Sequence, residues 1–479
     1  MQKLSLLLAV LSACAAQAAA AAAAPLSITD ARVLYHERAD VFRADNAQIA
    51  RAQHESDAAK MLGGPRVDLT LKQVYGTKTM ELEMGDAMSN VGNSLKAGVS
   101  QMPAPMQQAI APLLGGLSHN LSNLTIDVKT KLDGPRLTLD ATWPLYTGGL
   151  IDAQKRVLAE RVTETVADRD IRLATLDAQL AAKYWGVQLA RSIEALRQST
   201  LADQEDELKK AKRFEARGVI SKLERLAVEV ARDTAKREYD RARTSTQVAG
   251  AELAGALREA EVPALSTPLF VLTGELGTLS EWQLRAETNS PVLRRVQSLR
   301  QQADAGLSAA HAAFKPKVFA FGSRNLIKHY LSLTEPDWIA GIGVTFTLWS
   351  NTDRSSKIEA VSALIDSAAA ARDEALNQIR TAVETAFLRA VQYRDEYLST
   401  GSNVALAAEN LRLREKAFAE GLSTANDVDI ARTQRLAAEV SRRVAAYQFV
   451  VSWAMLHATA GRMDDFFASL SRPDVVSVR

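Results

Sequence analysis

The side chains with the clearest chemical potential are five methionines that gather in one stretch of the chain. They lie between residues 80 and 106, out of nine in the whole sequence, and thioether sulfur can bind Cu(I). The first three recur at i, i+4 and i+8, which is more simply the spacing of one apolar face of a short helix. Cysteine is absent from this stretch and the histidines are dispersed, so we expect no metal site and no cofactor. The five are Met80, Met84, Met88, Met102 and Met106.

Catalytic motifs are missing as well. The sequence contains neither a phosphate-binding Gly-Lys loop nor a nucleophile elbow, so we expect no enzyme and an energy source in a partner. Lys and Arg number 58 against 56 Asp and Glu, a balance that gives no basic field for nucleic acid.

The N-terminus is typical of an export signal. Lys3 is followed by the apolar stretch Leu4–Leu11 and by an alanine tract up to Ala24. Downstream, no run reaches the ~18–20 apolar residues of a membrane-spanning helix, so a bilayer would be entered as strands. The only cysteine, Cys14, follows a box like that of lipoproteins, where it would be lipidated. Cleavage within the alanine tract, which discards Cys14, is the alternative, and neither leaves a disulfide.

The sequence segments that would position a functional site occur twice in the chain. Trp143–Gly149 ends an alternating segment and opens a long helical one, and Phe346–Thr352 does the same 203 residues later. Gly218 and Gly421, each ending such a helical run, keep the same offset of 203. Two landmarks in one register indicate an internal duplication.

Each copy predicts a long antiparallel helical hairpin. The runs from about 150 to 217 and from about 353 to 420 contain no proline and almost no glycine, and at 1.5 Å per residue each would approach ~100 Å. Glycine then suits a left-handed cap and a chain reversal at Gly218 and Gly421. Returning helices are predicted at about 221–261 and 424–460.

A pair of strands precedes each long helix. Val67, Leu69 and Leu71 alternate with polar residues, and so do the segments 137–143 and 340–348, whereas 318–321 is one apolar run. Strands of about ten residues with one apolar face fit a membrane β-barrel, although a soluble hairpin would show the same pattern. The helix before each pair runs from Asp40 to Pro65 and from Pro291 to Pro316 at an offset of 251, which places about 48 extra residues in the first pair.

Together these features predict a mainly α chain with a membrane β part, in two tandem repeats. The expected domains are a signal peptide at 1–24, repeat 1 at 25–262 with the insertion at about 75–123, a linker at 263–280, repeat 2 at 281–465 and a C-terminal tail at 466–479. We expect the insertion to form an enlarged extracellular loop, broken up by Pro103, Pro105, Pro112 and the Gly115–Gly116 pair. Four strands cannot close a membrane barrel, so other copies of the chain must complete it.

The chain resembles the TolC-like outer-membrane efflux proteins over almost all of its mature length. The matching stretches are Pro25–Ile28, Trp143–Gly149 and Gly421–Val428, in this order and spacing. The resemblance implies a homotrimer, with a 12-stranded β-barrel in outer-membrane lipid continued by an α-helical, coiled-coil barrel in the periplasm. It implies a passive export duct of a tripartite efflux or type I secretion system. The partners implied are a periplasmic adaptor (membrane fusion) protein and an inner-membrane transporter of the RND or ABC type.

The resemblance also assigns candidate site residues. In the family an acid often follows the turn glycine by six residues and lines the periplasmic gate, which here gives Glu224 and Asp427, with Asp429 comparable. Helix-start acids that interact with the helix dipole are the alternative. Phe418 and Ser423 stand where other members carry a gate tyrosine and arginine, so a hydrogen bond from Phe418 is excluded.

Further expectations concern the strand ends. Pro144, Gly148 and Gly149 form the strand-to-helix junction, and Trp143, Tyr146 and Trp349 suit the aromatic belt of a membrane interface; ordinary strand-end packing is the alternative for these aromatics. For the whole chain, the alternatives are a soluble periplasmic scaffold or adaptor built on helical hairpins, and an adhesin or phage-receptor role for the insertion.

Overall fold

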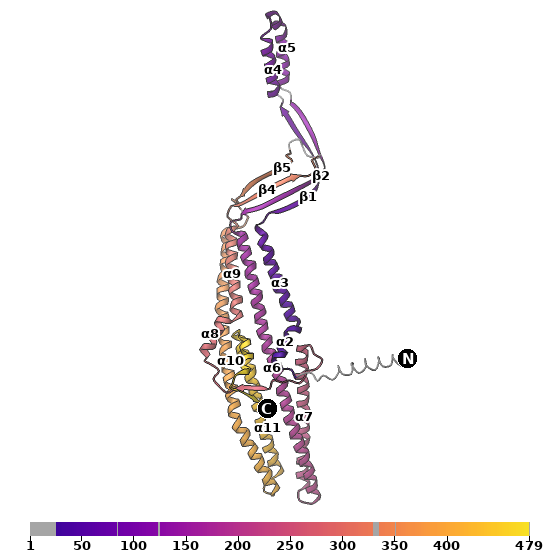
Figure 1. Ribbon diagram of the computed structural model, residues 1–479, viewed down its shortest axis with the longest axis vertical. Coiled ribbons are helices and arrows are strands. Elements are labelled where there is room, and N and C mark those ends of the chain that lie inside the picture. Colours follow the sequence, from indigo (N-terminus) through magenta and orange to yellow (C-terminus); the bar gives the residue numbers. More distant parts are fainter. Residues whose placement is uncertain (1–24, 84, 123–124, 329–334, 350, 479) are drawn as a thin grey trace, which may run out of the picture. The chain divides into compact units, whose positions relative to one another are not determined.

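A computed structural model of the chain describes residues 25–83, 85–122, 125–328, 335–349 and 351–478. The chain divides into two compact units, and each draws on both repeats (Figure 1). The helical unit comprises Met1–Ala59, Gln154–Leu307 and Glu359–Arg479, and the sheet unit comprises Lys60–Ala153 and Ser308–Ile358. The predicted signal at 1–24, with Cys14, lies outside the described residues.

The two predicted helical hairpins are confirmed. Helix α6 (Leu150–Ala216) turns into α7 (Lys222–Leu257), and α10 (Arg354–Ala419) turns into α11 (Ala425–Thr459). The long helices have 67 and 66 residues, because each run lacks a proline that would remove a backbone donor. Of the helices in the described residues, none has the length and hydropathy to cross a membrane.

Shorter helices precede each strand pair. Helix α2 (Ile28–Arg38) and α3 (Asp40–Lys60) precede the first pair, and α8 (Leu279–Asn289) and α9 (Pro291–Ala312) precede the second. Helix α3 therefore begins at Asp40, the expected position. The separate helix α2 precedes it, because Ala39 takes an extended conformation and ends α2.

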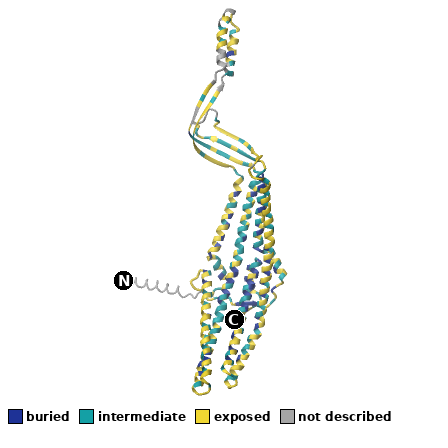
Figure 2. Cartoon of the chain, turned by 180° about the vertical axis from the view of Figure 1, so that it is seen from behind, coloured by how far each residue is buried: buried dark blue, intermediate teal, exposed yellow. Residues whose placement is uncertain are grey.

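The core of the helical unit is organised around a small second sheet. Strands β3 (Leu269–Leu272) and β6 (Val475–Val478) pair antiparallel, and all four residues of β3 are buried. Against this sheet pack aromatic side chains from α6, α11 and the short α12 (Met463–Ala468), among them Trp185, Phe449 and Phe466. Figure 2 shows the buried residues concentrated in this part of the helical unit. The expected linker thus contains a buried strand, β3, and the expected tail contains its half-exposed partner β6; the turn-rich sequence around them did not predict either strand.

Buried acids attach the N-terminal helices to α6. Asp177 is fully buried, and it accepts hydrogen bonds from Arg32 Nε at 2.8 Å and pairs with His36 Nε2 at 2.6 Å. Asp45, also buried, pairs with Arg172 at 2.7 Å. Since a buried carboxylate needs partners to offset its desolvation, these pairs fix where α2 and α3 lie on α6.

The four predicted strands form one antiparallel sheet in the order β1-β2-β4-β5. Their bounds are β1 Arg66–Glu83, β2 Thr125–Tyr146, β4 Lys317–Asn325 and β5 Trp338–Thr345. The last strand ends earlier than predicted, so Trp349 lies four residues beyond β5 and does not end a strand.

The two faces of this sheet differ in polarity. The pairing places Val67 opposite Ala141, Leu69 opposite Leu139 and, farther across, Trp143 opposite Ala320 and Ala320 opposite Ile342, so these side chains share one face. Leu69 is 63% and Ile342 71% exposed. The other face carries polar residues such as Thr70 and Asp140 on β1 and β2. In β4 the rings of Phe319 and Phe321 cover Gly343 and Gly341.

The insertion takes a different form from the predicted loop. Strands β1 and β2 continue as a two-stranded ladder to the pair Glu83–Thr125, and α4 (Gly85–Val99) and α5 (Ala104–Ser122) follow as a helical hairpin. Met80 lies in β1, so the expected helix face of methionines is wrong at that residue, and Met84 lies outside the described residues. The expected breakers Pro112, Gly115 and Gly116 lie inside α5, and only residues 100–103 interrupt the two helices.

Candidate functional site

The junction between strand and long helix requires glycine in the first repeat. Gly148 and Gly149 have φ of 69° and 93°, a region that favours glycine. A Cβ on Gly148 would lie 2.7 Å from Cβ of Lys315 and 2.9 Å from the carbonyl oxygen of Ala312, so no larger residue fits. Pro144 lies in β2, where the pairing with β4 shifts register between Pro144 and Tyr146.

The turns of the two long hairpins are built alike (Figure 1). Gly218 and Gly421 have φ of 72° and 74°. The N–H that follows each glycine donates to an equivalent carbonyl, Val219 to Phe214 at 2.9 Å and Leu422 to Ala417 at 2.8 Å. This pattern satisfies helix-end carbonyls by the left-handed cap expected from the sequence.

Two of the predicted gate acids complete helix caps. Glu224 accepts from the N–H of Ser221 at 2.7 Å and Asp427 from the N–H of Thr424 at 3.0 Å, while each hydroxyl accepts in return from the backbone N–H of its acid. The N–H and the hydroxyl of Thr424 hold the pKa of Asp427 below its usual value. Asp427 therefore stays charged at the tip, and the Ser423 hydroxyl donates to it as well, at 3.2 Å.

The third acid connects the two repeats. Asp429 on α11 accepts a hydrogen bond of 2.6 Å from Nε2 of Gln204 on α6, a residue that is 4% exposed. Asp429 was among the gate residues predicted from the sequence, whereas Gln204 was not predicted. The position 203 residues after Gln204 is Ala407, so the duplication carried no signal for it.

Each tip also has its own ion pair and small core. Arg225 pairs with Glu215 at 2.8 Å in the first hairpin, and Arg432 donates to Glu415 at 3.2 Å in the second. Phe418 packs against Leu411, Val428 and Ala431. The Phe418 ring thus contributes apolar packing at the tip, and without a hydroxyl it donates no hydrogen bond.

A groove runs beside these contacts between the two hairpins. Its cavity volume is about 590 Å³, and its walls come from α6, α7 and α11. Along α7 it is lined by Leu223, Leu226 and Val230, which are exposed and recur at helical spacing as one apolar stripe. Polar residues, including Gln204 and Asp429, complete the lining.

The predicted interface aromatics lie in the sheet unit. Trp143 and Tyr146 are each about half exposed and Trp349 is 91% exposed. The indole N–H of Trp143 donates to the carbonyl of Gly63 at 3.0 Å. The indole is therefore held at its polar edge, while about half of the side chain stays exposed.

Neither the protein-family models nor the curated proteins contain a match to this chain. Solved structures do match it over nearly its whole length. It is similar to CusC, at 11% identity and a TM-score of 0.70, over 90% of this chain and 91% of that one. It is also similar to the outer membrane protein VceC of Vibrio cholerae, at 13% identity and a TM-score of 0.68, over 91% and 96%.

A third similar structure is the CmeC outer membrane channel of Campylobacter jejuni. The identity is 12% and the TM-score 0.69, over 91% of this chain and 86% of that one. Together these likenesses cover both repeats, the sheet and the helical hairpins. The chain therefore has the TolC-like fold that its sequence predicted.

Proposed function

We propose that the chain is one third of a trimeric outer-membrane channel that conducts solutes passively from the periplasm to the exterior. The observation that carries this proposal is the four-stranded sheet, whose apolar face is exposed while its other face is polar on β1 and β2. A soluble protein would have to cover that apolar face, whereas lipid covers it in a membrane barrel.

The sheet edges support several copies per channel. Within the described residues the sheet ends at β1 on one side and β5 on the other, and unpaired backbone groups in lipid cost several kcal/mol each. Four strands cannot close a barrel. Pairing of β5 with β1 of the next copy closes a ring, and three copies give the twelve strands that the fold suggests.

The helical tips support docking of a partner. We assign the groove beside Leu223, Leu226 and Val230 to a helical hairpin of the periplasmic adaptor, because exposed apolar stripes accept amphipathic helices. An inner-membrane transporter of the RND or ABC type would supply the energy.

The same tips support the assignment of a gate. A ring of Glu224 and Asp427 carboxylates from three chains would make a constriction that favours cations. The hydrogen bond from Gln204 to Asp429 links the hairpins of the two repeats, so separation of the hairpins would require it to break. We therefore assign Gln204 and Asp429 to the closed state of the gate.

Insertion of the purified protein into planar lipid bilayers tests the proposal. We expect detergent-extracted trimers that give stepwise, cation-selective conductance. Gln204→Leu should raise the open fraction, and Asp427→Asn should lower cation selectivity. A monomer that is soluble without detergent and inactive in bilayers would overturn the channel and favour a periplasmic scaffold.

A further inference from the structure

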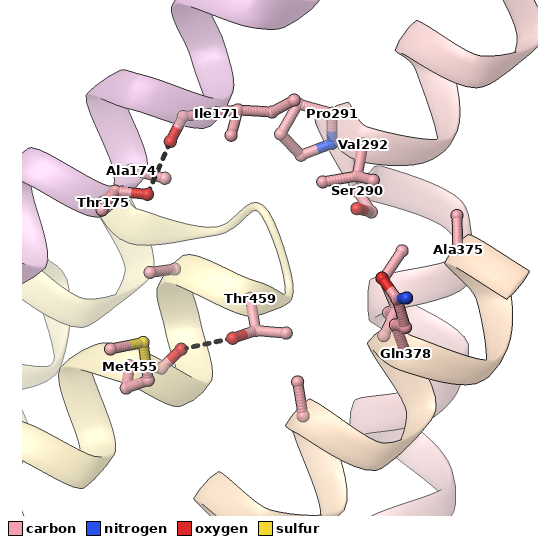
Figure 3. Close-up of a pocket in the computed structure, with 13 residues that line it drawn as sticks. Ile171, Ala174, Thr175, Ser290, Pro291, Val292, Ala375, Gln378, Met455 and Thr459 are labelled. Atoms are coloured by element: carbon pink, nitrogen blue, oxygen red, sulfur yellow. Dashed lines mark hydrogen bonds between the residues drawn. The ribbon is translucent and has the colours of Figure 1, made fainter.

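Two apolar hollows of the helical unit differ in the charge around them. One lies among α6, α9, α10 and α11 (Figure 3), and its described lining residues carry no charge, so it has no group that would select a partner by electrostatics. The other is the groove of about 590 Å³ at the hairpin tips, whose α7 wall is the apolar stripe Leu223, Leu226 and Val230. Exposed cations belong to the same tip as this stripe.

The two hairpin tips differ in charge although their turns have the same backbone. Residues 209–225 of the first hairpin contain seven lysines and arginines and two acids, whereas the equivalent stretch 412–428 of the second contains three of each. The first tip is therefore cationic and the second is balanced.

Three positions account for this difference in net charge. In the first hairpin they are exposed cations, Lys212, Arg217 and Lys222. In the second hairpin, 203 residues later, they are two acids and an alanine, Glu415, Glu420 and Ala425. The duplication thus keeps the turn and reverses or removes its charges.

The three cations have no partner within the described part of the chain, where neither an ion pair nor a side-chain hydrogen bond joins them to another residue. The acids of the same tip are already engaged. Glu215 pairs with Arg225 at 2.8 Å, and Glu224 accepts the N–H of Ser221 at 2.7 Å. Carboxylates of a partner can therefore pair with the three cations without breaking an existing contact.

One of these cations shares a helix face with the apolar stripe, and the other two flank the stripe in the chain. Lys222 precedes Leu226 by four residues in α7, so both side chains lie on one face of that helix. Arg217 lies in the turn that leads to α7, and Lys212 lies in the last two turns of α6. The stripe is also confined to the first repeat, because the residues 203 positions later are polar, Asn426, Asp429 and Thr433.

We propose that the tip of the first hairpin binds an acidic amphipathic helix, with its apolar side in the groove and its carboxylates on Lys212, Arg217 and Lys222. This inference rests on the proposed docking of an adaptor at the groove, and it specifies the chemistry of the adaptor helix. A groove with walls from α6, α7 and α11 receives a ridge of side chains, whereas contact with lipid lays an apolar face flat on the membrane. The second hairpin has neither the cations nor the stripe, so one of the two tips in each chain makes this contact.

The test uses the full-length protein in phosphatidylcholine nanodiscs, with empty nanodiscs as the blank, and two labelled synthetic helices. Both helices carry the same leucine face, and the polar face carries glutamate in one and glutamine in the other. In about 0.1 M NaCl, fluorescence anisotropy should show about tenfold tighter binding of the glutamate helix, the combined value of three exposed ion pairs. In about 1 M NaCl this preference should vanish because salt screens exposed charges, while the glutamine helix stays bound.

A variant that carries the charges of the second tip on the first tests the three cations directly. Exchange of all three for their counterparts should remove the preference for the glutamate helix, by Lys212→Glu, Arg217→Glu and Lys222→Ala. The glutamine helix should bind this variant as it binds the wild type, which also shows that the variant is folded.

The matched control is a cation that both tips share. Arg213 has Lys416 as its counterpart, and it follows Gln204 of the groove by nine residues, which places it on the opposite side of α6. Arg213→Glu should therefore change binding of the glutamate helix by less than about twofold in about 0.1 M NaCl. Leu226→Asn, which interrupts the stripe without adding charge, should weaken both helices by the same factor.

Several results would overturn the proposal. Equal binding of the two helices by the wild type would remove the acidic partner, and so would an effect of Arg213→Glu as large as that of the threefold exchange. Binding of phosphatidylglycerol vesicles through the three cations, without selection of the glutamate helix, would assign the tip to a membrane surface instead. A protein that conducts but does not select the glutamate helix would refute this inference alone. One that selects the helix but does not conduct would keep this contact and refute the channel.

Discussion

The two repeats agree closely in their helices and differ widely in their strands. The long helices have 67 and 66 residues and the returning helices 36 and 35. The strand pairs have 18 and 22 residues in the first repeat, but 9 and 8 in the second. The agreement extends to single hydrogen bonds in both turns.

The difference shows where length is constrained. Helices that turn at a common end and pack side by side must match, because an unequal one would expose an apolar stripe. Strands need to match only where all four pair. Beyond the end of β4, no third strand among the described residues pairs with the ladder of β1 and β2, so extra residues there disturb no described neighbour.

The largest effect is expected from arginine substitutions that test whether the strands of both repeats share one lipid-facing surface. Leu69→Arg in β1 and Ile342→Arg in β5 should each destabilise the assembled barrel by about 2–4 kcal/mol per chain, the cost of a cation on a lipid face. The heat-dissociation temperature of the trimer measures it. Thr70→Arg, on the polar face, is the matched control and should change little. Equal effects of Thr70→Arg and Leu69→Arg would contradict a lipid-facing assignment.

The accuracy of the sequence-based predictions also differs between the long helices and the other elements. The long hairpins were predicted within a few residues because the absence of proline, the capping glycines and the repeat all agree. Strand β3 was missed because Pro263, Pro268 and Gly274 around it are typical of a linker, and its partner β6 is about two hundred residues away. Gln204 was missed because a long-range hydrogen bond to one acid has no periodic signature. In the insertion, Gly115 and Gly116 stay helical because helix propensity is only a weak preference.

A second expectation concerns the core that both repeats share. Burial lowers the pKa of His457 to about 4, and its Nδ1 lies 3.1 Å from the carbonyl oxygen of Arg462. The unfolded chain then binds more protons between about pH 4 and 6.5, so stability is complete above about 6.5 and is lost as the pH falls to about 4. The loss is about 3 kcal/mol. Denaturation midpoints against pH should show this slope.

The matched variants isolate that titration. His457→Leu should flatten the slope between pH 4 and 6.5, whereas His54→Gln, at an exposed histidine of α3, should leave it intact. The position equivalent to His457 in the first repeat is Ala254, 203 residues earlier. The contribution of this buried histidine is therefore expected from the second repeat only, and an unchanged slope in His457→Leu would refute it.

The ends of the returning helices give a sharper comparison. Arg258 after α7 and Gly461 after α11 occupy equivalent positions and both have positive φ, 55° and 67°. A Cβ on Gly461 meets the carbonyl oxygen of Asn289 at 2.6 Å. Gly461→Ala should therefore cost about 3 kcal/mol from backbone strain and overpacking. Arg258→Gly should be nearly neutral, because relief of the left-handed backbone offsets the loss of an exposed ion pair with Asp40. Chemical denaturation compares the two, and similar costs would mean that the close contact at Gly461 is relieved by movement.

The smallest effect is expected where the repeats differ most. Replacing residues 84–124 by Asn-Gly, which suits a tight hairpin turn, joins Glu83 to Thr125, already partners in the ladder. The helices α4 and α5 pack chiefly against each other, so trimer stability and conductance should stay within experimental error of the wild type. Loss of the trimer would show instead that the helical hairpin is part of the assembly. If the trimer persists but phage adsorption or cell adhesion is lost, the insertion is a surface recognition element that the duct itself does not need.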